Sequence, residues 1–171
     1  MMATMAMTRR ATAHDLAAIT DIYNEAILNT VATFDTGTKT IKEQKKWFNS
    51  HDSQHPVLVA EQDSVVVGWA SLSKWSDRCA YSSTAEVSLY VKHDYRGKGI
   101  GKTLLKALIQ TGENAGIHTA IARITEGNEA SISLFRQEGF ENVGVMKEVG
   151  RKFDRLLDVF ILQKIFESKS K

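Results

Sequence analysis

The chain has 171 residues, of which 43% are hydrophobic, and a formal net charge of +2. This length suits one globular domain with a substantial core, and the small net charge gives no case for a nucleic-acid or membrane partner. The single cysteine, Cys79, excludes an internal disulfide and favours a cytoplasmic protein. No cluster of cysteine and histidine has zinc-ligand spacing, so we expect no metal.

Residues 1–7 are mildly apolar but too short for the core of a signal peptide, and no basic segment precedes them. We expect them to be a disordered start. A single domain is expected over 8–166, followed by a polar tail at 167–171. No internal repeat or low-complexity linker divides this domain.

The first half of the domain alternates between helical and strand patterns. Apolar residues from Leu16 to Ile27 recur at helical spacing, and Thr40 with Glu43 forms a capping box at the start of a second helix. Two short apolar runs joined by a polar turn predict a β-hairpin. The expected elements are a strand near 8–11, a helix at 16–27, a helix after Thr40, and hairpin strands at 57–60 and 65–72.

The second half begins with a strand at 85–91, in which apolar residues alternate with Glu86, Ser88 and Tyr90 on the opposite face. The elements expected after it are a helix that begins near Ile100 and ends at Gly112 and Gly116, a strand at 119–125, a helix at 129–138 with Asn128 as N-cap, and strands at 143–149 and 157–164. This order favours an α/β fold, with a mixed sheet covered by helices on both faces.

A basic, glycine-rich turn from Arg96 to Thr103 links the strand at 85–91 to the helix that follows. Glycines at alternate positions allow the backbone to turn sharply and to bring its N–H groups close to a ligand. The helix behind the turn adds the positive end of its dipole, and Arg96, Lys98 and Lys102 add charge. The turn therefore predicts a site for a phosphate or a pyrophosphate.

Spacing separates three kinds of phosphate site. A nucleotide P-loop needs glycine at position 96, where this chain has Arg96, and no later apolar strand ends in an aspartate suited to magnesium. A dinucleotide fingerprint needs a third glycine at position 102, where Lys102 stands. Both of these readings are therefore disfavoured.

The segment Arg96-Gly97-Lys98-Gly99-Ile100-Gly101 resembles the pyrophosphate loop of the GCN5-related N-acetyltransferase (GNAT) superfamily. The resemblance extends from Arg9 to about Gln163. Within the superfamily, Arg78-x-x-Tyr81, Thr84-x-Glu86-x-Ser88-x-Tyr90-Val91 and Gly150-x-Lys152-Phe153 resemble the phosphinothricin and methionine sulfoximine acetyltransferase branch. The fold implied is a single-domain GNAT-like one, with a mostly antiparallel mixed sheet that splays at the cofactor site.

The resemblance also implies acetyl-coenzyme A (acetyl-CoA) as the donor. Backbone groups of the strand would receive its pantetheine arm, the glycine turn would bind its pyrophosphate, and the asparagine-led helix would line the far side. Asn128 has an equal alternative role as a helix cap, and the two roles can coexist. The implied cofactor-binding residues are Leu89, Tyr90, Val91, Arg96, Gly97, Lys98, Gly99, Ile100, Gly101, Lys102, Asn128 and Ser131.

Transfer of an acetyl group to an amine requires a neutral nitrogen, and therefore a group that accepts a proton. Glu86 matches the superfamily's glutamate and is the expected catalytic base, directly or through water. The alternative is a strand carboxylate that faces solvent or pairs with a lysine. Many relatives place a tyrosine where this chain has Phe135, which cannot donate a proton and is expected to pack instead.

The implied acceptor is the amine of a small amino acid or analogue. Arg78 would contact its carboxylate, Tyr81 would add a hydroxyl or a wall, and Phe34 would supply an apolar wall. Ordinary surface or core packing is the alternative for each of the three. Relatives commonly have tryptophan before the aspartate where this chain reads Leu157-Asp158, which alters the expected pocket.

The leading functional hypothesis is thus an acetyl-CoA-dependent N-acetyltransferase of a small-molecule amine. Two alternatives remain, namely acetylation of protein N-termini and a non-catalytic acyl-CoA sensor in which Glu86 is dispensable. Homodimers are common in the resembling family, and Phe153 and Phe160 are candidates for such an interface.

Overall fold

The computed structural model describes residues 5–167. Positions 1–4 of the expected disordered start and 168–171 of the expected polar tail lie outside the described residues. Within the described range the first strand already includes Met7. No helix between residues 5 and 167 is both long enough and apolar enough to cross a membrane.

The strands and helices follow the predicted order and lie close to the predicted bounds. They are β1 (Met7–Arg10), α1 (Leu16–Asn29), α2 (Ile41–Asn49), β2 (Val57–Gln62), β3 (Val65–Lys74), β4 (Thr84–Val91), α3 (Ile100–Asn114), β5 (Thr119–Thr125), α4 (Glu129–Gln137), β6 (Glu141–Lys152) and β7 (Arg155–Ile165). Short 3-10 turns precede α1, β4 and α3.

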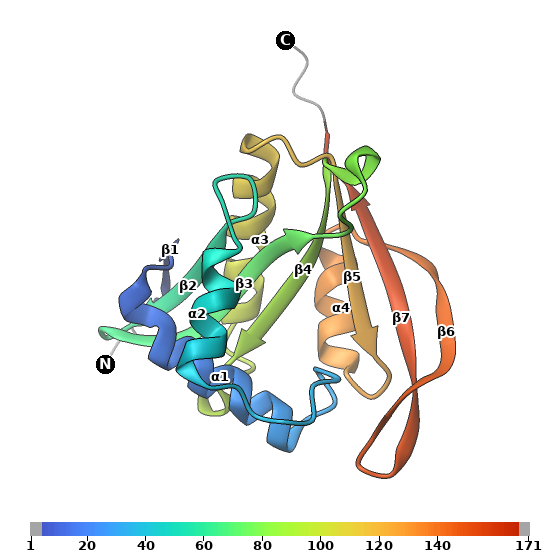
Figure 1. Cartoon of the computed structure of the whole chain (residues 1–171), viewed down its shortest axis with the longest axis horizontal. Helices are drawn as coiled ribbons and strands as arrows, with labels where there is room; N and C mark the ends of the chain where they lie inside the picture. Colours follow the sequence, from blue (N-terminus) through green and yellow to red (C-terminus); the bar gives the residue numbers. More distant parts are fainter. Residues whose placement is uncertain (1–4, 168–171) are drawn as a thin grey trace.

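The described strands form one seven-stranded sheet in the order β1-β2-β3-β4-β5-β7-β6 (Figure 1). Every neighbouring pair is antiparallel except β4 and β5, which run parallel because α3 connects them across the sheet. The expectation of a mixed, mostly antiparallel sheet is confirmed.

The parallel pair is also where the sheet opens. β4 and β5 are in register only from Thr84–Thr119 to Glu86–Ile121, and beyond that point the two strands diverge toward their carboxyl ends (Figure 1). The predicted splay is therefore present, and it begins at Glu86.

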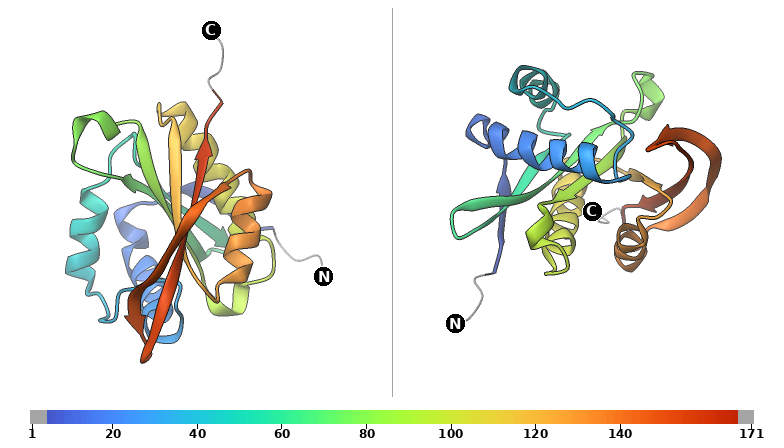
Figure 2. Two further views of the ribbon diagram at one scale, coloured as in Figure 1. Left: turned by 90° about the vertical axis from the view of Figure 1, so that its right-hand side faces the viewer. Right: turned by 90° about the horizontal axis from the view of Figure 1, so that it is seen from below.

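Helices cover both faces of the sheet. α1 and α2 lie on one face, and α3 and α4 lie on the other (Figures 1 and 2). The α1 side buries a small cluster around Trp69 and Ile19, whereas the α3 side buries the larger core around Leu104, Leu108 and Phe135. The alternation of β4 divides its residues between these two layers, so Glu86, Ser88 and Tyr90 share the α1 side.

Two sets of side-chain hydrogen bonds fix the connection between α1 and α2. The side-chain amide of Asn24 donates to the carbonyl of Lys39 at 3.0 Å, and its oxygen accepts the Lys39 N–H at 2.7 Å. The predicted capping box is present, because Thr40 accepts the Glu43 N–H and the Glu43 carboxylate accepts the Thr40 N–H. The loop between the two helices is thus fixed at its far end.

One sequence expectation was wrong. Gly112 does not end α3 but lies buried within it, where an added Cβ would press on Leu72. The helix continues to Asn114, and Gly116 follows it with a φ of +89°. The last two strands lie near the predicted bounds and extend one to three residues further at each end, meeting at a tight turn in which Phe153 and Asp154 both have positive φ. The residues around this turn include several charged ones, so the sequence there shows no alternation of apolar and polar residues that would predict a strand.

Asp15, next to α1, is 6% exposed and accepts two hydrogen bonds of 2.8 Å from Arg9 and one of 2.7 Å from the Thr12 N–H. These bonds, those from Arg9 first, hold the pKa of the Asp15 carboxyl below its ordinary value. Its contribution to stability is therefore complete above the pKa of the unfolded chain, about 3.9, and is lost as the pH falls through the lowered native pKa.

We expect Asp15→Asn to lower the free energy of unfolding by about 1 kcal/mol at pH 7, since half-exposed Arg9 leaves the pair partly screened. The variant should also lose part of the wild-type decline in stability below pH 4. Urea unfolding at several pH values measures both effects, with exposed Asp21→Asn as the control. An acid decline of wild-type steepness in Asp15→Asn would contradict this account.

Candidate active site

A groove of about 760 Å³ runs through the opening of the sheet. The end of β4, the glycine turn, the start of α4 and the end of α1 with the loop after it form its walls. Every predicted cofactor residue except Lys98 borders it. The lining consists of Ala26, Thr30, Val31, Ala32, Leu89, Tyr90, Val91, Tyr95, Arg96, Gly97, Gly99, Ile100, Gly101, Lys102, Gly127, Asn128, Ala130, Ser131, Ser133, Leu134 and Gln137.

The glycine turn has the geometry of an anion site. Gly97 and Gly99 have φ values of +71° and +81°, which side-chain-bearing residues rarely adopt. The Thr103 N–H bonds the carbonyl of Gly99, so the N–H groups of residues 100–102 precede the hydrogen-bonding ladder of α3. Free N–H groups and the helix dipole together favour a phosphate at this end of the groove.

The basic residues of the turn do not all face the groove as free charges. Arg96 braces the turn, because its Nε donates to the carbonyl of Val91 at 3.0 Å and its guanidinium pairs with Glu25 of α1 at 3.3 Å. Lys98 lies over the ring of Tyr95, which borders the groove, but Lys98 does not border it. Lys102 is the lysine of this turn that borders the groove.

Asn128 occupies the N-cap position of α4, but its side chain makes no capping hydrogen bond, so that part of the prediction was wrong. Its backbone carbonyl accepts the N–H groups of Ser131 and Ile132 at 3.1 and 3.2 Å instead. Ser131, one turn further, borders the groove with it. The amide of Asn128 is thereby left for a ligand in the groove.

Glu86 lies on β4 at the last residue that pairs with β5. Its Oε1 accepts from Arg123 Nε at 2.9 Å and its Oε2 from the terminal nitrogen of Arg123 at 2.8 Å. The Arg123 guanidinium also lies 5.7 Å from the centre of the Trp75 ring. The sequence analysis missed Arg123, although one cation among the apolar residues of β5 was a signal that could have found it.

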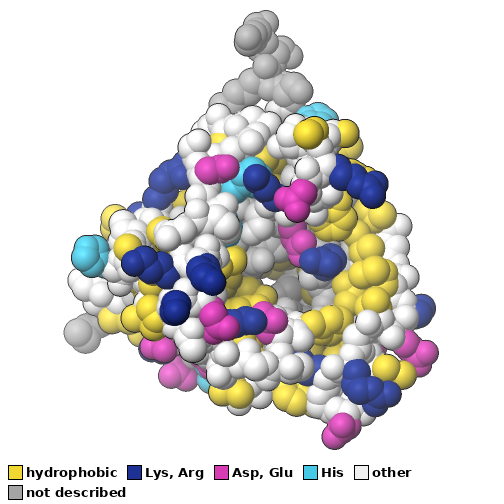
Figure 3. Space-filling view, in the orientation of Figure 1, with side chains coloured by type: hydrophobic (Ala, Val, Ile, Leu, Met, Phe, Trp, Pro, Cys, Tyr) yellow, Lys and Arg dark blue, Asp and Glu magenta, His cyan; other side chains and the backbone are white. Residues whose placement is uncertain are grey.

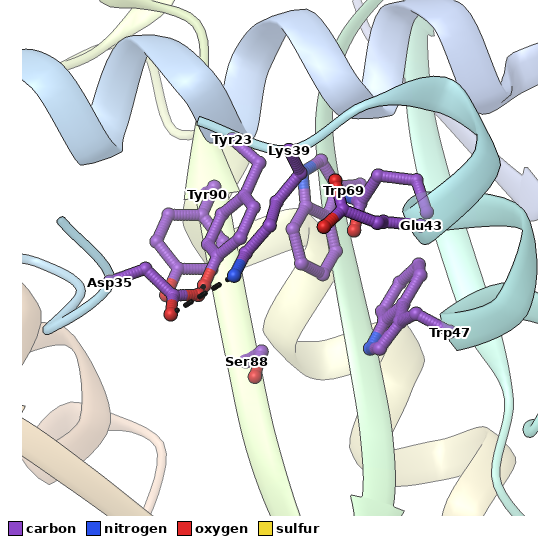
Figure 4. Close-up of a pocket in the computed structure, with 9 residues that line it drawn as sticks. Tyr23, Asp35, Lys39, Glu43, Trp47, Trp69, Ser88 and Tyr90 are labelled. Carbon is purple, nitrogen blue, oxygen red and sulfur yellow. Dashed lines mark hydrogen bonds and ion pairs between the residues drawn. The ribbon is translucent and has the colours of Figure 1, made fainter. Parts of the chain in front are cut away.

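A second cavity, of about 320 Å³, lies further along the same face of β4. Its aromatic rings pack edge-on, and Figure 4 shows Lys39 reaching toward Asp35 beside the Tyr23 hydroxyl. Burial raises the pKa of Tyr90 to about 12, so this hydroxyl stays protonated near neutral pH. The residues around the cavity are Tyr23, Asp35, Lys39, Glu43, Gln44, Trp47, Trp69, Ser88 and Tyr90.

Of the three predicted acceptor residues, Arg78 and Tyr81 lie together, and Phe34 lies apart from them. The Phe34 ring, 38% exposed, packs on the backbone of Gly150 in β6. Arg78 and Tyr81 border a different hollow of about 300 Å³ after β3, together with Asp52 and His55. Within residues 5–167, none of the three predicted residues makes a hydrogen bond with Glu86.

The β6–β7 hairpin is tied to the loop between α1 and α2. Lys152 of β6 is 4% exposed and its ammonium donates to the carbonyl of Thr33 at 2.8 Å. Burial lowers the pKa of this lysine. This hydrogen bond therefore holds the hairpin and the loop against each other.

The molecular surface carries a hollow with charged side chains at its margin and, beside it, a hydrophobic region (Figure 3). Figure 3 shows a hollow near the middle of the face, with acidic and basic side chains side by side at its margin. Hydrophobic side chains gather over β6 and β7, where Val145, Val149 and Leu156 are exposed. Phe135 lies elsewhere, 4% exposed and edge-on to Phe140, as expected of a packing residue.

The fold, the glycine turn and the opened sheet define the class of protein. The sequence profile of the acetyltransferase (GNAT) family matches residues 17–140, and the chain belongs to this family. An L-methionine sulfoximine/L-methionine sulfone acetyltransferase of Pseudomonas aeruginosa is 41% identical over 160 residues, which are 92% of this chain and 93% of that protein.

Solved structures show the same similarity. A phosphinothricin acetyltransferase from Sinorhizobium meliloti, in complex with acetyl-CoA, superposes with a TM-score of 0.90 at 38% identity and covers 94% of this chain and 88% of that one. A ribosomal-protein-alanine N-acetyltransferase from Brucella melitensis superposes equally well, with a TM-score of 0.90 at 41% identity over 94% and 99% of the two chains.

The contact between Phe34 and Gly150 predicts the effect of one added methyl group. A Cβ at position 150 would overlap the Phe34 ring, so Gly150→Ala must displace the loop. We expect the free energy of unfolding of Gly150→Ala to fall by about 1–3 kcal/mol, which lowers the melting temperature by several degrees. Gly144→Ala in the same strand, where a Cβ meets nothing within 4 Å, is the control. If Phe34→Ala fails to relieve the loss in a double variant, the contact is not its cause.

Proposed function

We propose that the protein transfers the acetyl group of acetyl-CoA to the amine of a small amino acid or a close analogue. The observation that carries this proposal is the position of Glu86, which stands where the sheet opens, on the strand whose end, Leu89 to Val91, borders the groove. Ser88 and Tyr90, on the same face of that strand as Glu86, border the second cavity. We therefore expect the donor and the acceptor to meet beside this carboxylate.

The residues present fit acetyl-CoA. The N–H groups of the glycine turn and Lys102 would hold its pyrophosphate, the exposed backbone of Leu89 to Val91 would receive its pantetheine arm, and Asn128 would bind from the opposite wall. When bound, acetyl-CoA supplies an acetyl thioester, whose C–S bond breaks as the C–N bond of the amide forms. Relatives described as binding acetyl-CoA support this choice of donor.

Glu86 accepts the proton that the amine loses as it attacks, directly or through one water molecule. Phe135 offers no proton donor for the departing thiolate, because its ring carries no hydroxyl group, and it packs against Phe140. A thiolate is a tolerable leaving group, and solvent in the open groove supplies its proton. Proton transfer in this site thus relies on one titratable side chain, that of Glu86.

Small amino acids are the proposed acceptors because relatives of similar length are named for methionine sulfoximine, methionine sulfone and phosphinothricin. Phe34, Arg78 and Tyr81 are the proposed acceptor contacts, of which Arg78 and Tyr81 lie in the loop that leads into β4, the strand of Glu86. Acetylation of a protein N-terminus and acyl-CoA sensing without catalysis are the competing functions.

We also propose that the protein acts as a cytoplasmic homodimer. The free Cys79 is exposed, which suits a reducing compartment. Phe153 is 53% exposed at the tip of the β6–β7 hairpin, among the other exposed apolar residues there. Phe160 instead packs against the core, so Phe153 is the better candidate for a contact between subunits.

The first test of this function is Glu86→Gln. We expect turnover to fall by about 10²-fold, since general base catalysis typically contributes at least this much, while acetyl-CoA binding stays unchanged. Release of coenzyme A is measured with phosphinothricin, methionine sulfone, polyamines and short peptides as acceptors, with exposed Glu141→Gln as the control. Wild-type turnover in Glu86→Gln would refute the base, and preference for peptides would support the N-terminal alternative.

The second test concerns the donor site. Gly99→Ala places a Cβ on a residue with a φ of +81°, which strains the turn by about 1 kcal/mol or more and shifts the N–H groups of α3. We expect acetyl-CoA affinity, measured by calorimetry, to fall by about tenfold. Gly37→Ala, which meets nothing within 4 Å and has no positive φ, should bind normally. Equal affinities for the two variants would remove the turn from the donor site.

A further inference from the structure

Arg123 holds both oxygens of the proposed base. Its guanidinium fork, formed by Nε and a terminal nitrogen, donates to Oε1 and Oε2 of Glu86 at 2.9 and 2.8 Å. The carboxylate cannot turn toward an amine while both hydrogen bonds are present. Resting on the proposed function, we propose that Arg123 binds the carboxylate of the amino acid acceptor, which displaces Glu86 from the guanidinium and frees it to act as base.

The surroundings of Arg123 fit a carboxylate guest. Its side chain is 49% exposed, so one carboxylate can leave and another can enter without burying an unpaired charge. The Trp75 ring, 5.7 Å from the guanidinium carbon, supports the fork. In the described part of the chain, Glu86 is the acid within ion-pair distance of Arg123. A planar fork of this kind matches a carboxylate in two parallel hydrogen bonds.

The chemistry of the acceptor gives a second, independent reason. In an α-amino acid a single carbon separates the amine from the carboxylate. The residue that binds the carboxylate must therefore lie near the base that serves the amine, on the same side of the site. Arg123 meets this condition, whereas Arg78 borders the hollow with Asp52 and His55.

In this ion pair, the carboxylate of Glu86 consequently takes the place on Arg123 that the carboxylate of the acceptor would occupy. The carboxylate of Glu86 occupies the guanidinium until an acceptor arrives, and the 49% exposure of the Arg123 side chain allows an incoming carboxylate to compete for it. This assigns to Arg123 the carboxylate that the sequence analysis assigned to Arg78. Arg78 then remains available for the far end of the acceptor.

The first experiment compares acceptors that differ only in the carboxylate. Turnover is measured with methionine sulfone and phosphinothricin, and with the carboxamide of each. For Arg123→Met we expect the KM of the acids to rise by about tenfold or more and that of the amides to change by less than about twofold. Arg123→Lys should restore part of the preference for the acid. Arg10→Met, on the remote edge strand β1, should match wild type, and Arg78→Met serves as the comparison.

The second experiment tests the exchange itself with a desamino analogue of the acceptor, which has the carboxylate but no amine. It should inhibit wild type weakly, because it competes with Glu86 for the fork. Glu86→Gln removes that competitor and should lower the inhibition constant severalfold. Adding Arg123→Met to Glu86→Gln should abolish the gain.

Retention of the wild-type preference for the acid in Arg123→Met, with wild type still acetylating amino acids, would overturn this assignment and leave the proposed function intact. Loss of turnover with acids and amides alike, in a variant whose circular dichroism and melting temperature are unchanged, would also overturn it, because Arg123 would then only position Glu86. If wild type acetylates peptides and no amino acid, the proposed function itself fails.

Discussion

The separation of β4 from β5 is the constraint on which the rest of the structure depends. The two strands pair over only three positions, so backbone groups of β4 that point toward β5 beyond Glu86 have no partner strand. A sheet tolerates such an opening only where water or a ligand takes the place of the missing strand. The groove follows this opening, with the glycine turn at one end and Asn128 on the opposite wall, and Glu86 is the residue at which the pairing of the two strands stops.

The two helical layers give the two sides of the opening different chemistry. On the α3 side, the apolar residues of β4 lock the strand to a large core, and the glycine turn follows directly from that packing. On the α1 side, Ser88 and Tyr90 face polar and aromatic groups from segments distant in the sequence, and Glu86 pairs with Arg123. One strand thus joins the apolar core on one face to polar and charged groups on the other.

Much of this arrangement was readable in the sequence because it depends on local patterns. The capping box at Thr40, the alternation around Glu86 and the glycine turn can each be recognised from a few consecutive residues. The ion pair of Glu86 with Arg123 and the tie between Lys152 and Thr33 join residues far apart in the chain, and no local pattern encodes such contacts. Asn128 shows the converse, since a sound local rule for caps failed where the side chain faces a groove.

The buried bond from Lys152 to Thr33 has a consequence for how this protein can diversify. It joins the β6–β7 hairpin to the loop between α1 and α2, whose first residues, Thr30, Val31 and Ala32, line the groove, whereas no residue of the hairpin does. Substitutions in the hairpin can therefore change the surface beside this loop while the groove keeps its lining residues. Such a division allows one inherited scaffold to vary this side of the molecule by changes confined to a single hairpin.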